Sequence, residues 1–267
     1  MIHVQTGAVD TNRPRALFDN AFASSAGTIT GDADTSFPVS NLATETTWEY
    51  WKPPSASLAD AIVTLTSSVF ADCAFIGAHE LGSSGARFRI HYSQDGGTTW
   101  VPIITLTAPT NDEPIMVVFP RVSANAFRLQ QIDGPAPIGI FMIGEALVFE
   151  NGVDQRYTSF RHGQRIEVQG GNSLGGHFLG QRIRRRGGNT SIRFPLLTSD
   201  FVDTDMDEFE THYNDGRAFA FATNPDFRET DLAYCWRPDD ANELRPQYFE
   251  NGIYEEFTMN VEYYVGA

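Results

Sequence analysis

The sequence predicts a mainly β protein of two domains, with a linker over residues 151–164. Residues 1–150 read as an antiparallel β-sandwich, because short apolar runs alternate with turn residues and no helical stripe of three turns occurs among them. Residues 165–267 read as a smaller α+β domain, because one amphipathic helix is followed by strand patterns. An apolar content of 41% and an aromatic content of 12% suffice to fill two buried cores.

The strands of the first domain fall into two kinds. Residues 61–66, 87–93 and 126–132 alternate apolar and polar positions, which predicts one buried and one exposed face. Residues 114–119 and 138–149 are more continuously apolar, which predicts burial on both faces. Segments rich in Gly, Pro, Asn and Asp separate these runs and predict turns.

The second domain opens with an arginine-rich segment, "GQRIRRRGGNTSIRF" (180–194). Taking Gly187-Gly188 as a two-residue turn predicts a hairpin in which Arg182 lies opposite Arg193. Like charges placed opposite each other destabilise a sheet, so anions should cover this face. The arginines that share it are Arg182, Arg184, Arg186 and Arg193.

A helix is expected next, at about residues 199–214. Ser199 can cap its N-terminus and Gly216 follows its end. Its apolar residues recur at steps of four, three and four, which marks one helical face. They are Val202, Met206, Phe209 and Tyr213. A strand at 218–223 follows, and an Asn251-Gly252 turn leads into a long last strand.

Charge limits what the arginines can face. The chain carries a formal net charge of −15, and Lys52 is its one lysine. That charge argues against a general binder of nucleic acids or anionic membranes. We favour protein carboxylates as the anions that cover the arginines, either from the acidic helix of the same or a neighbouring protomer or from a partner protein. A merely solvated face and nucleic acid are the less favoured alternatives. Candidate interface carboxylates are Asp203, Asp207 and Glu210.

Other classes of protein are not indicated. Cys73 and Cys235 are expected as buried free thiols, although a bridge between them stays open. No signal peptide or membrane span is expected, and no sequence pattern has zinc-ligand, phosphate-loop or nucleophile-elbow spacing. We therefore expect no enzyme and no cofactor, and a chain that is synthesised in a cytoplasm.

The first domain resembles the discoidin, or galactose-binding-like, family over roughly residues 10–150. The stretches that carry the likeness are "RIHYSQDGGTTWVPI" (89–103), "NLATETTWEYW" (41–51) and the strands after them. The resemblance implies a jelly roll that binds glycans or lipid headgroups in loops at one end. Trp48 is a candidate for those loops, although burial against the sheet is favoured for it, and Trp100 is expected in the core. Candidate glycan-binding residues are Tyr50, Trp51, His79, Glu80, Asn111 and Asp112. Asp32 and Asp34 form a sparse calcium-type pair, short of the six or more oxygens that calcium takes.

The second domain resembles the tail-tube-related domain of distal tail, or baseplate ring, proteins of tailed bacteriophages. The likeness rests on the order of an arginine-rich strand, "PLLT", an acidic helix, an "FAF" strand, an "NPD" turn and a long last strand. It implies a virion structural protein that forms a ring, often six-fold, and contacts tube, hub and fibre proteins. The alternative is a carbohydrate-binding adhesin that acts through the discoidin-like domain, with a host surface glycan as partner.

Overall fold

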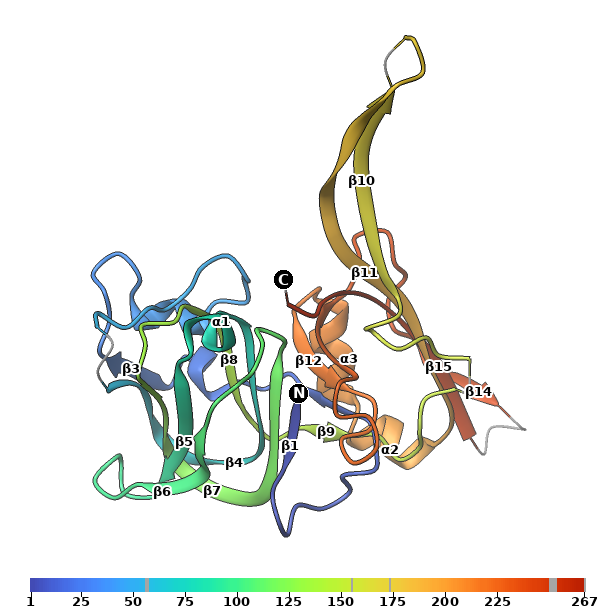
Figure 1. Ribbon diagram of the computed structural model, residues 1–267. Coiled ribbons are helices and arrows are strands. Elements are labelled where there is room, and N and C mark those ends of the chain that lie inside the picture. Colours follow the sequence, from blue (N-terminus) through green and yellow to red (C-terminus); the bar gives the residue numbers. More distant parts are fainter. Residues whose placement is uncertain (56–57, 155, 173, 250–253, 267) are drawn as a thin grey trace.

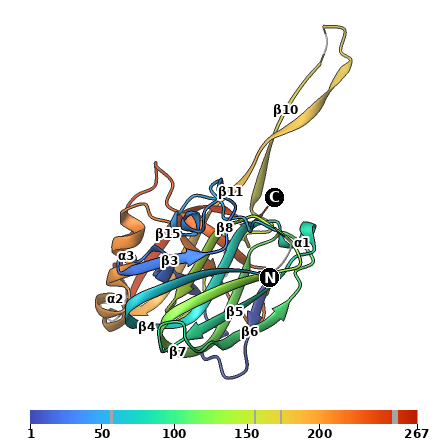
Figure 2. The same cartoon turned by 90° about the vertical axis from the view of Figure 1, so that its left-hand side faces the viewer.

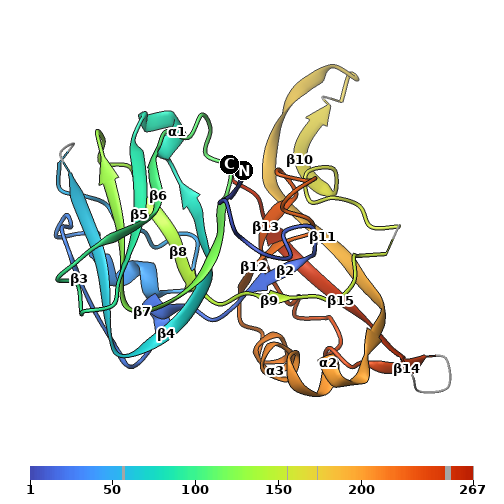
Figure 3. The same ribbon diagram turned by 90° about the horizontal axis from the view of Figure 1, so that it is seen from below.

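The computed structural model describes residues 1–55, 58–154, 156–172, 174–249 and 254–266, but not the side chains of 165–169, 172, 181–186 and 249. The chain forms two large sheets in which almost all neighbouring strands are antiparallel (Figures 1 and 3). The predicted mainly β class is confirmed. No described helix is long and apolar enough to cross a membrane.

Two long strands organise the first sheet, β4 (Ala59–His79) and β7 (Ile115–Ile132). The strand order is β3-β4-β7-β5-β6, while β8 pairs with β4 and β1 pairs with β7. The shorter members are β1 (Ile2–Val4), β3 (Gly27–Gly31), β5 (Arg87–Ser93), β6 (Val101–Thr107) and β8 (Ile138–Gly144). Short helical turns cover its ends: η1 (Ala21–Ala23), η2 (Val39–Ala43) and α1 (Leu81–Ser84). The two strands predicted at 114–119 and 126–132 are therefore halves of β7.

The first sheet folds over on itself. The pairing of β4 with β7 shifts register between Thr64 and Val69 and again between Ala71 and Cys73. The first half of β4 pairs with β3, whereas its second half pairs with β8. Irregular pairing of this kind bends strands, so β4 and β7 pass from one layer into the other and enclose an apolar core.

The second sheet has the order β10-β11-β15-β13-β12-β2-β9, with β14 beside β15. Its members are β2 (Arg15–Leu17), β9 (Leu147–Val148), β10 (Gln164–Asn172), β11 (Phe178–Thr198), β12 (Phe219–Ala222), β13 (Leu232–Trp236), β14 (Gln247–Phe249) and β15 (Tyr254–Tyr264). The Asn251-Gly252 turn lies outside the described residues. Because β2 and β9 belong here, both ends of the expected first domain contribute to the second sheet. The expected linker also packs on this sheet, since Phe160 is fully buried in its core.

The two sheets share a third apolar cluster. The outer faces of β4, β7 and β8 place Phe75, Met116 and Met142 against residues of β12 and β13. Phe75 stacks on Tyr234 with ring centroids 5.8 Å apart. The predicted burial of 114–119 on both faces is thus confirmed, because the first core covers one face and the second sheet covers the other. For 138–149 it is confirmed over 138–144 only, since Leu147 and Val148 are half-buried in the second sheet.

The predicted helix is two helices, α2 (Ser199–Thr204) and α3 (Asp207–Asn214), with the break at Asp205 and Met206. All four residues of the predicted apolar stripe are buried, so the face is confirmed. The N-cap is Thr198 rather than Ser199, and its Oγ1 accepts from the amide of Phe201.

The predicted turn at Gly187-Gly188 is wrong. Strand β11 runs straight through both glycines, and its hairpin partner is β10, which precedes it. Arg182 faces Gln169 and Arg193 faces Thr258, so the expected Arg182–Arg193 opposition does not occur. The physical reason is that Gly188 makes room for the ring of Tyr263 rather than for a reversal of the chain.

Candidate functional site

Two of the expected glycan-binding residues are buried in the sandwich. Trp51 is fully buried, and its Nε1 donates to the Asp32 carbonyl at 2.8 Å. His79 is 3% exposed, and its Nδ1 accepts from the amide of Leu81 at 3.3 Å. Its Nε2 therefore carries the proton and donates to the carbonyl of Glu113 at 2.9 Å. Neither side chain can reach a ligand, so both assignments are wrong.

Three other expected residues gather around helix α1. Glu80 precedes the helix and is exposed, and the Asp112 carboxylate accepts from the amide of Ser83 at 3.0 Å. A Cβ on Gly82 would lie 2.4 Å from the Asn111 backbone, so this loop packs tightly on the helix. The three form a polar cluster around α1 in which the Asp112 carboxylate already has a backbone donor.

The aromatic residue that is available at the surface is one that the sequence placed in the core. Trp48 is 75% exposed, whereas Trp51, three residues later, pairs with Ile138 and fills the core position. Tyr50 is half-buried, with its ring stacked on Phe37 at 4.5 Å. The favoured burial of Trp48 is therefore wrong, and the sequence offered no signal to decide which tryptophan turns inward.

The other predicted core tryptophan, Trp100, is half-buried under the guanidinium of Arg128, 4.6 Å from its ring centroid. The turn before it is held by Asp95, which accepts from the Ser93 hydroxyl and the Thr99 amide. These donors lower the pKa of Asp95 to about 2. This motif is structural.

The calcium-type pair is occupied by backbone donors. Asp32 accepts from the amide of Asp60 at 3.1 Å, and Asp34 accepts from the amide of Ser36 at 2.9 Å. In the described part of the chain no three acidic, His or Cys side chains are grouped to hold a metal ion.

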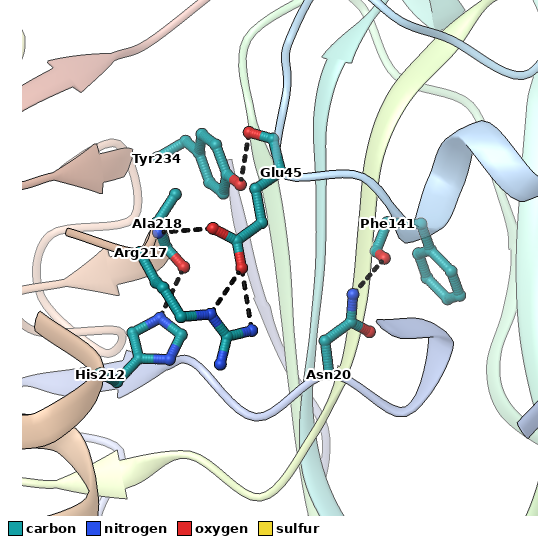
Figure 4. Close-up of polar contacts among 7 residues, drawn as sticks. All are labelled: Asn20, Glu45, Phe141, His212, Arg217, Ala218 and Tyr234. Atoms are coloured by element: carbon teal, nitrogen blue, oxygen red, sulfur yellow. Dashed lines mark hydrogen bonds and ion pairs between the residues drawn. The ribbon is translucent and has the colours of Figure 1, made fainter. Parts of the chain in front are cut away.

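Glu45 ties the loop that carries Trp48 to the second sheet (Figure 4). Its Oε1 accepts from Nε and Nη2 of Arg217, both at 2.9 Å, and its Oε2 accepts from the amide of Ala218 at 3.1 Å. The Tyr234 hydroxyl donates to the Glu45 carbonyl at 3.0 Å. The loop is thereby positioned by the second sheet as well as by the sandwich.

Residues 164–172 and 174–188 form an arm, a hairpin of β10 and the first half of β11 that stands clear of the body (Figures 1 and 2). The arm carries five arginines and one glutamate, a net charge of +4 in a chain of −15. The side chains of Arg182, Arg184 and Arg186 lie outside the described residues. A register shift skips Arg184, which breaks the strict alternation behind the predicted arginine face.

Arg193 lies below the arm and is neutralised within its own chain. Its Nη2 is 2.5 Å from Oε2 of Glu256, and its Nη1 is 3.8 Å from Asp154. The carboxylates that cover this arginine are therefore not those of α2 and α3, the nearest acidic candidates in the sequence.

The acidic helices lie far from the arm, at the other end of the second sheet (Figures 1 and 3). Residues 199–214 hold six carboxylates and no Lys or Arg. Asp203 and Asp207 are exposed, and Glu210 is half-buried with its pKa raised by burial and by the neighbouring charge of Asp207. Among the described residues, none of the six carboxylates takes part in an ion pair.

Both cysteines are buried and free, as the sequence predicted. Burial raises the pKa of each thiol, which leaves them unreactive at neutral pH.

No protein-family model matches the sequence, and no curated protein matches it. Among solved structures, a fucosidase of Ruminococcus gnavus is 11% identical, with a TM-score of 0.41, over 48% of this chain and 27% of the fucosidase. A chitosan-binding module from a chitosanase/glucanase of Paenibacillus sp. IK-5 is 18% identical, with a TM-score of 0.41, over 47% of this chain and 98% of the module. A pectin-binding carbohydrate-binding module is 17% identical, with a TM-score of 0.38, over 43% of this chain and 88% of the module. The chain thus spans about a quarter of the length of the fucosidase.

Proposed function

We propose that the protein is a structural subunit of a tailed-phage virion, a distal tail or baseplate ring component in which the arm joins neighbouring copies. The observation that carries the proposal is the arm itself. A hairpin with net charge +4 extends from a body whose remaining residues sum to −19, and the body does not surround it. A projecting, oppositely charged element of this kind fits a second protein surface.

The acidic helices are the complementary surface. Within one chain the arm points away from α2 and α3, so it cannot lie on its own helices (Figures 1 and 3). An arm on the helices of the next copy is a heterologous contact, which closes into a ring when the rotation per subunit allows. Arginine forks and carboxylates suit such a contact, and many weak ion pairs act together in it.

Charge reversal tests the contact. We expect Arg182→Glu with Arg184→Glu to abolish oligomers, as measured by light scattering after gel filtration, while the circular dichroism spectrum stays unchanged. The matched control is Arg13→Glu with Arg245→Glu, which makes the same charge change at exposed arginines outside the arm. Asp203→Arg with Asp207→Arg on the partner copy should restore association with the reversed arm. A wild-type protein that stays monomeric, alone and with tail proteins, would refute the proposal.

A second function is favoured by one observation, the exposed ring of Trp48. A tryptophan that is 75% exposed on a fixed loop of the sandwich can stack on the apolar face of a sugar ring. We propose carbohydrate recognition at this loop, with Glu45 as a residue that positions it. Trp48→Ala should remove binding on a glycan array, whereas Tyr248→Ala, at an exposed aromatic of the second sheet, should not. Equal binding by Trp48→Ala and wild type would exclude this site.

A further inference from the structure

The end of the arm is apolar. Leu174 is fully exposed, and Phe178 and Leu179 are each 68% exposed. Glycines flank them in the sequence, at 170, 171, 175, 176 and 180, and His177 is the one ionisable side chain between Leu174 and Leu179. Large apolar side chains grouped at the end of a projecting element mark a contact surface, because leaving them in water is costly.

A hollow of about 590 Å³ lies beside the loop that connects β12 and β13 of the second sheet. It lies between residues 152–154 and 157–162 on one side and the loop between β12 and β13 on the other. Val153, Tyr157 and Phe227 give it apolar walls, and Asp154, His162 and Arg228 line it with charged or polar groups. Phe227 is 80% exposed beside it. Asp231, at its base, is already bonded to the Thr223 hydroxyl and the Phe160 amide, so its carboxylate is structural.

This hollow adjoins the acidic helices. Glu150 accepts from the amide of Thr198, the N-cap of α2, and Asn151 donates to the carbonyl of Leu196. Residues 150–151 therefore connect the hollow's wall to the start of α2. One extended segment could lie along the helices and end in the hollow.

We propose that the apolar tip of the arm seats in this hollow on a second copy of the chain, with Phe178 or a neighbouring tip residue against Phe227. The proposal rests on the proposed function, since it names the surface that receives the arm. At about 3.3 Å per residue, Arg182 lies about 13 Å and Arg186 about 26 Å from Phe178 along the strand. With the tip in the hollow, the arginines reach the region of α2 and α3, where the helix carboxylates carry the opposite charge.

Cysteine cross-linking tests the pairing directly. We mix the Phe178→Cys variant with the Phe227→Cys variant and oxidise mildly. The native thiols give little background, because both are buried. We expect a covalent dimer from the mixture, and a ladder of larger species from a chain that carries both substitutions. The control pair is Phe178→Cys with Leu106→Cys, where the second site lies on β6 of the first sheet and is 40% exposed, and we expect no cross-link from it.

Association of the variants gives a second readout. Leu174→Ser with Leu179→Ser should weaken oligomerisation by at least about tenfold while leaving the arginines in place. If wild-type oligomers form and depend on the arm arginines, yet this variant associates normally and Phe178→Cys does not link to Phe227→Cys, the tip contact is overturned and the proposed function stands. If wild type forms no oligomers, both fall. Capture of phosphatidylcholine vesicles by the tip in place of association between copies also overturns the contact.

Discussion

Gly188 lies directly beneath the ring of Tyr263. A Cβ on Gly188 would be 2.0 Å from Cζ and 2.2 Å from the hydroxyl oxygen of that ring. The hydroxyl donates to the Phe160 carbonyl at 2.9 Å, so the ring is held at both ends. Gly188→Ala should therefore lower the free energy of unfolding by about 1–3 kcal/mol, as an overpacked core substitution does.

Urea denaturation measures this loss, and Gly171→Ala is the matched control. Gly171 is also in the arm, and a Cβ there would meet nothing within 4 Å. We expect its midpoint to stay near that of wild type. Equal midpoints for Gly188→Ala and wild type would mean that the ring can move aside at little cost.

The glycine pair shows why part of the fold could not be read from the sequence. Two adjacent glycines are typical of a turn, yet they also permit close packing of a ring, and only the strand partner decides between these. The apolar run at 114–119 correctly indicated burial on both faces, but not that β12 and β13 supply the second cover. Trp48 and Trp51 posed the same problem, because one loop cannot reveal which ring faces the sheet. Local sequence patterns predicted correctly which residues are buried. They failed where the structure depends on which distant segment packs against a residue.

The shared core predicts that the two halves do not fold separately. A fragment of residues 1–150 would expose Phe75, Met116 and Met142, which the second sheet covers in the full chain. Strand β2 would also lose β12. We expect the fragment to aggregate or to bind a hydrophobic dye, and the full chain to unfold in one transition by both fluorescence and circular dichroism. A monomeric, cooperatively folded fragment would show that the sandwich is independent after all.

His79 predicts a loss of stability in acid. Burial lowers its pKa from 6.5 to about 4 in the folded protein. Between pH 6.5 and about pH 4, His79 is protonated in the unfolded chain but stays neutral in the folded protein. The free energy of unfolding therefore falls as pH falls through this range. We expect His79→Gln to flatten part of the fall in unfolding free energy between about pH 7 and about pH 4.5. His162→Gln, at an exposed position, is the control, and an unchanged slope in His79→Gln would assign the acid sensitivity to other groups.

Glu45→Ala should cost about 1 kcal/mol of stability, because the ion pair is partly exposed and contributes little beyond its backbone contact. Glu45→Gln keeps an acceptor for the Ala218 amide and should recover part of that loss. If the loop matters for recognition, Glu45→Ala should weaken glycan binding by more than its effect on stability at the assay temperature explains. A binding loss that Glu45→Gln does not relieve would point instead to direct contact of the carboxylate with the ligand.

Salt should separate the two parts of the arm contact. The Debye length falls from about 10 Å at 0.1 M to about 3 Å at 1 M ionic strength, so exposed arginine–carboxylate attraction between copies weakens as salt rises. Burial of the apolar tip does not depend on this attraction. Salt also screens the repulsion between the negatively charged bodies of neighbouring copies. We therefore expect light scattering to show that wild-type oligomers dissociate more readily at about 1 M than at about 0.1 M NaCl. The Arg182→Glu, Arg184→Glu variant should stay monomeric at both ionic strengths, because its arm no longer attracts the helices. Oligomers of wild type that strengthen steadily with salt would show that the helices are not the partner of the arginines.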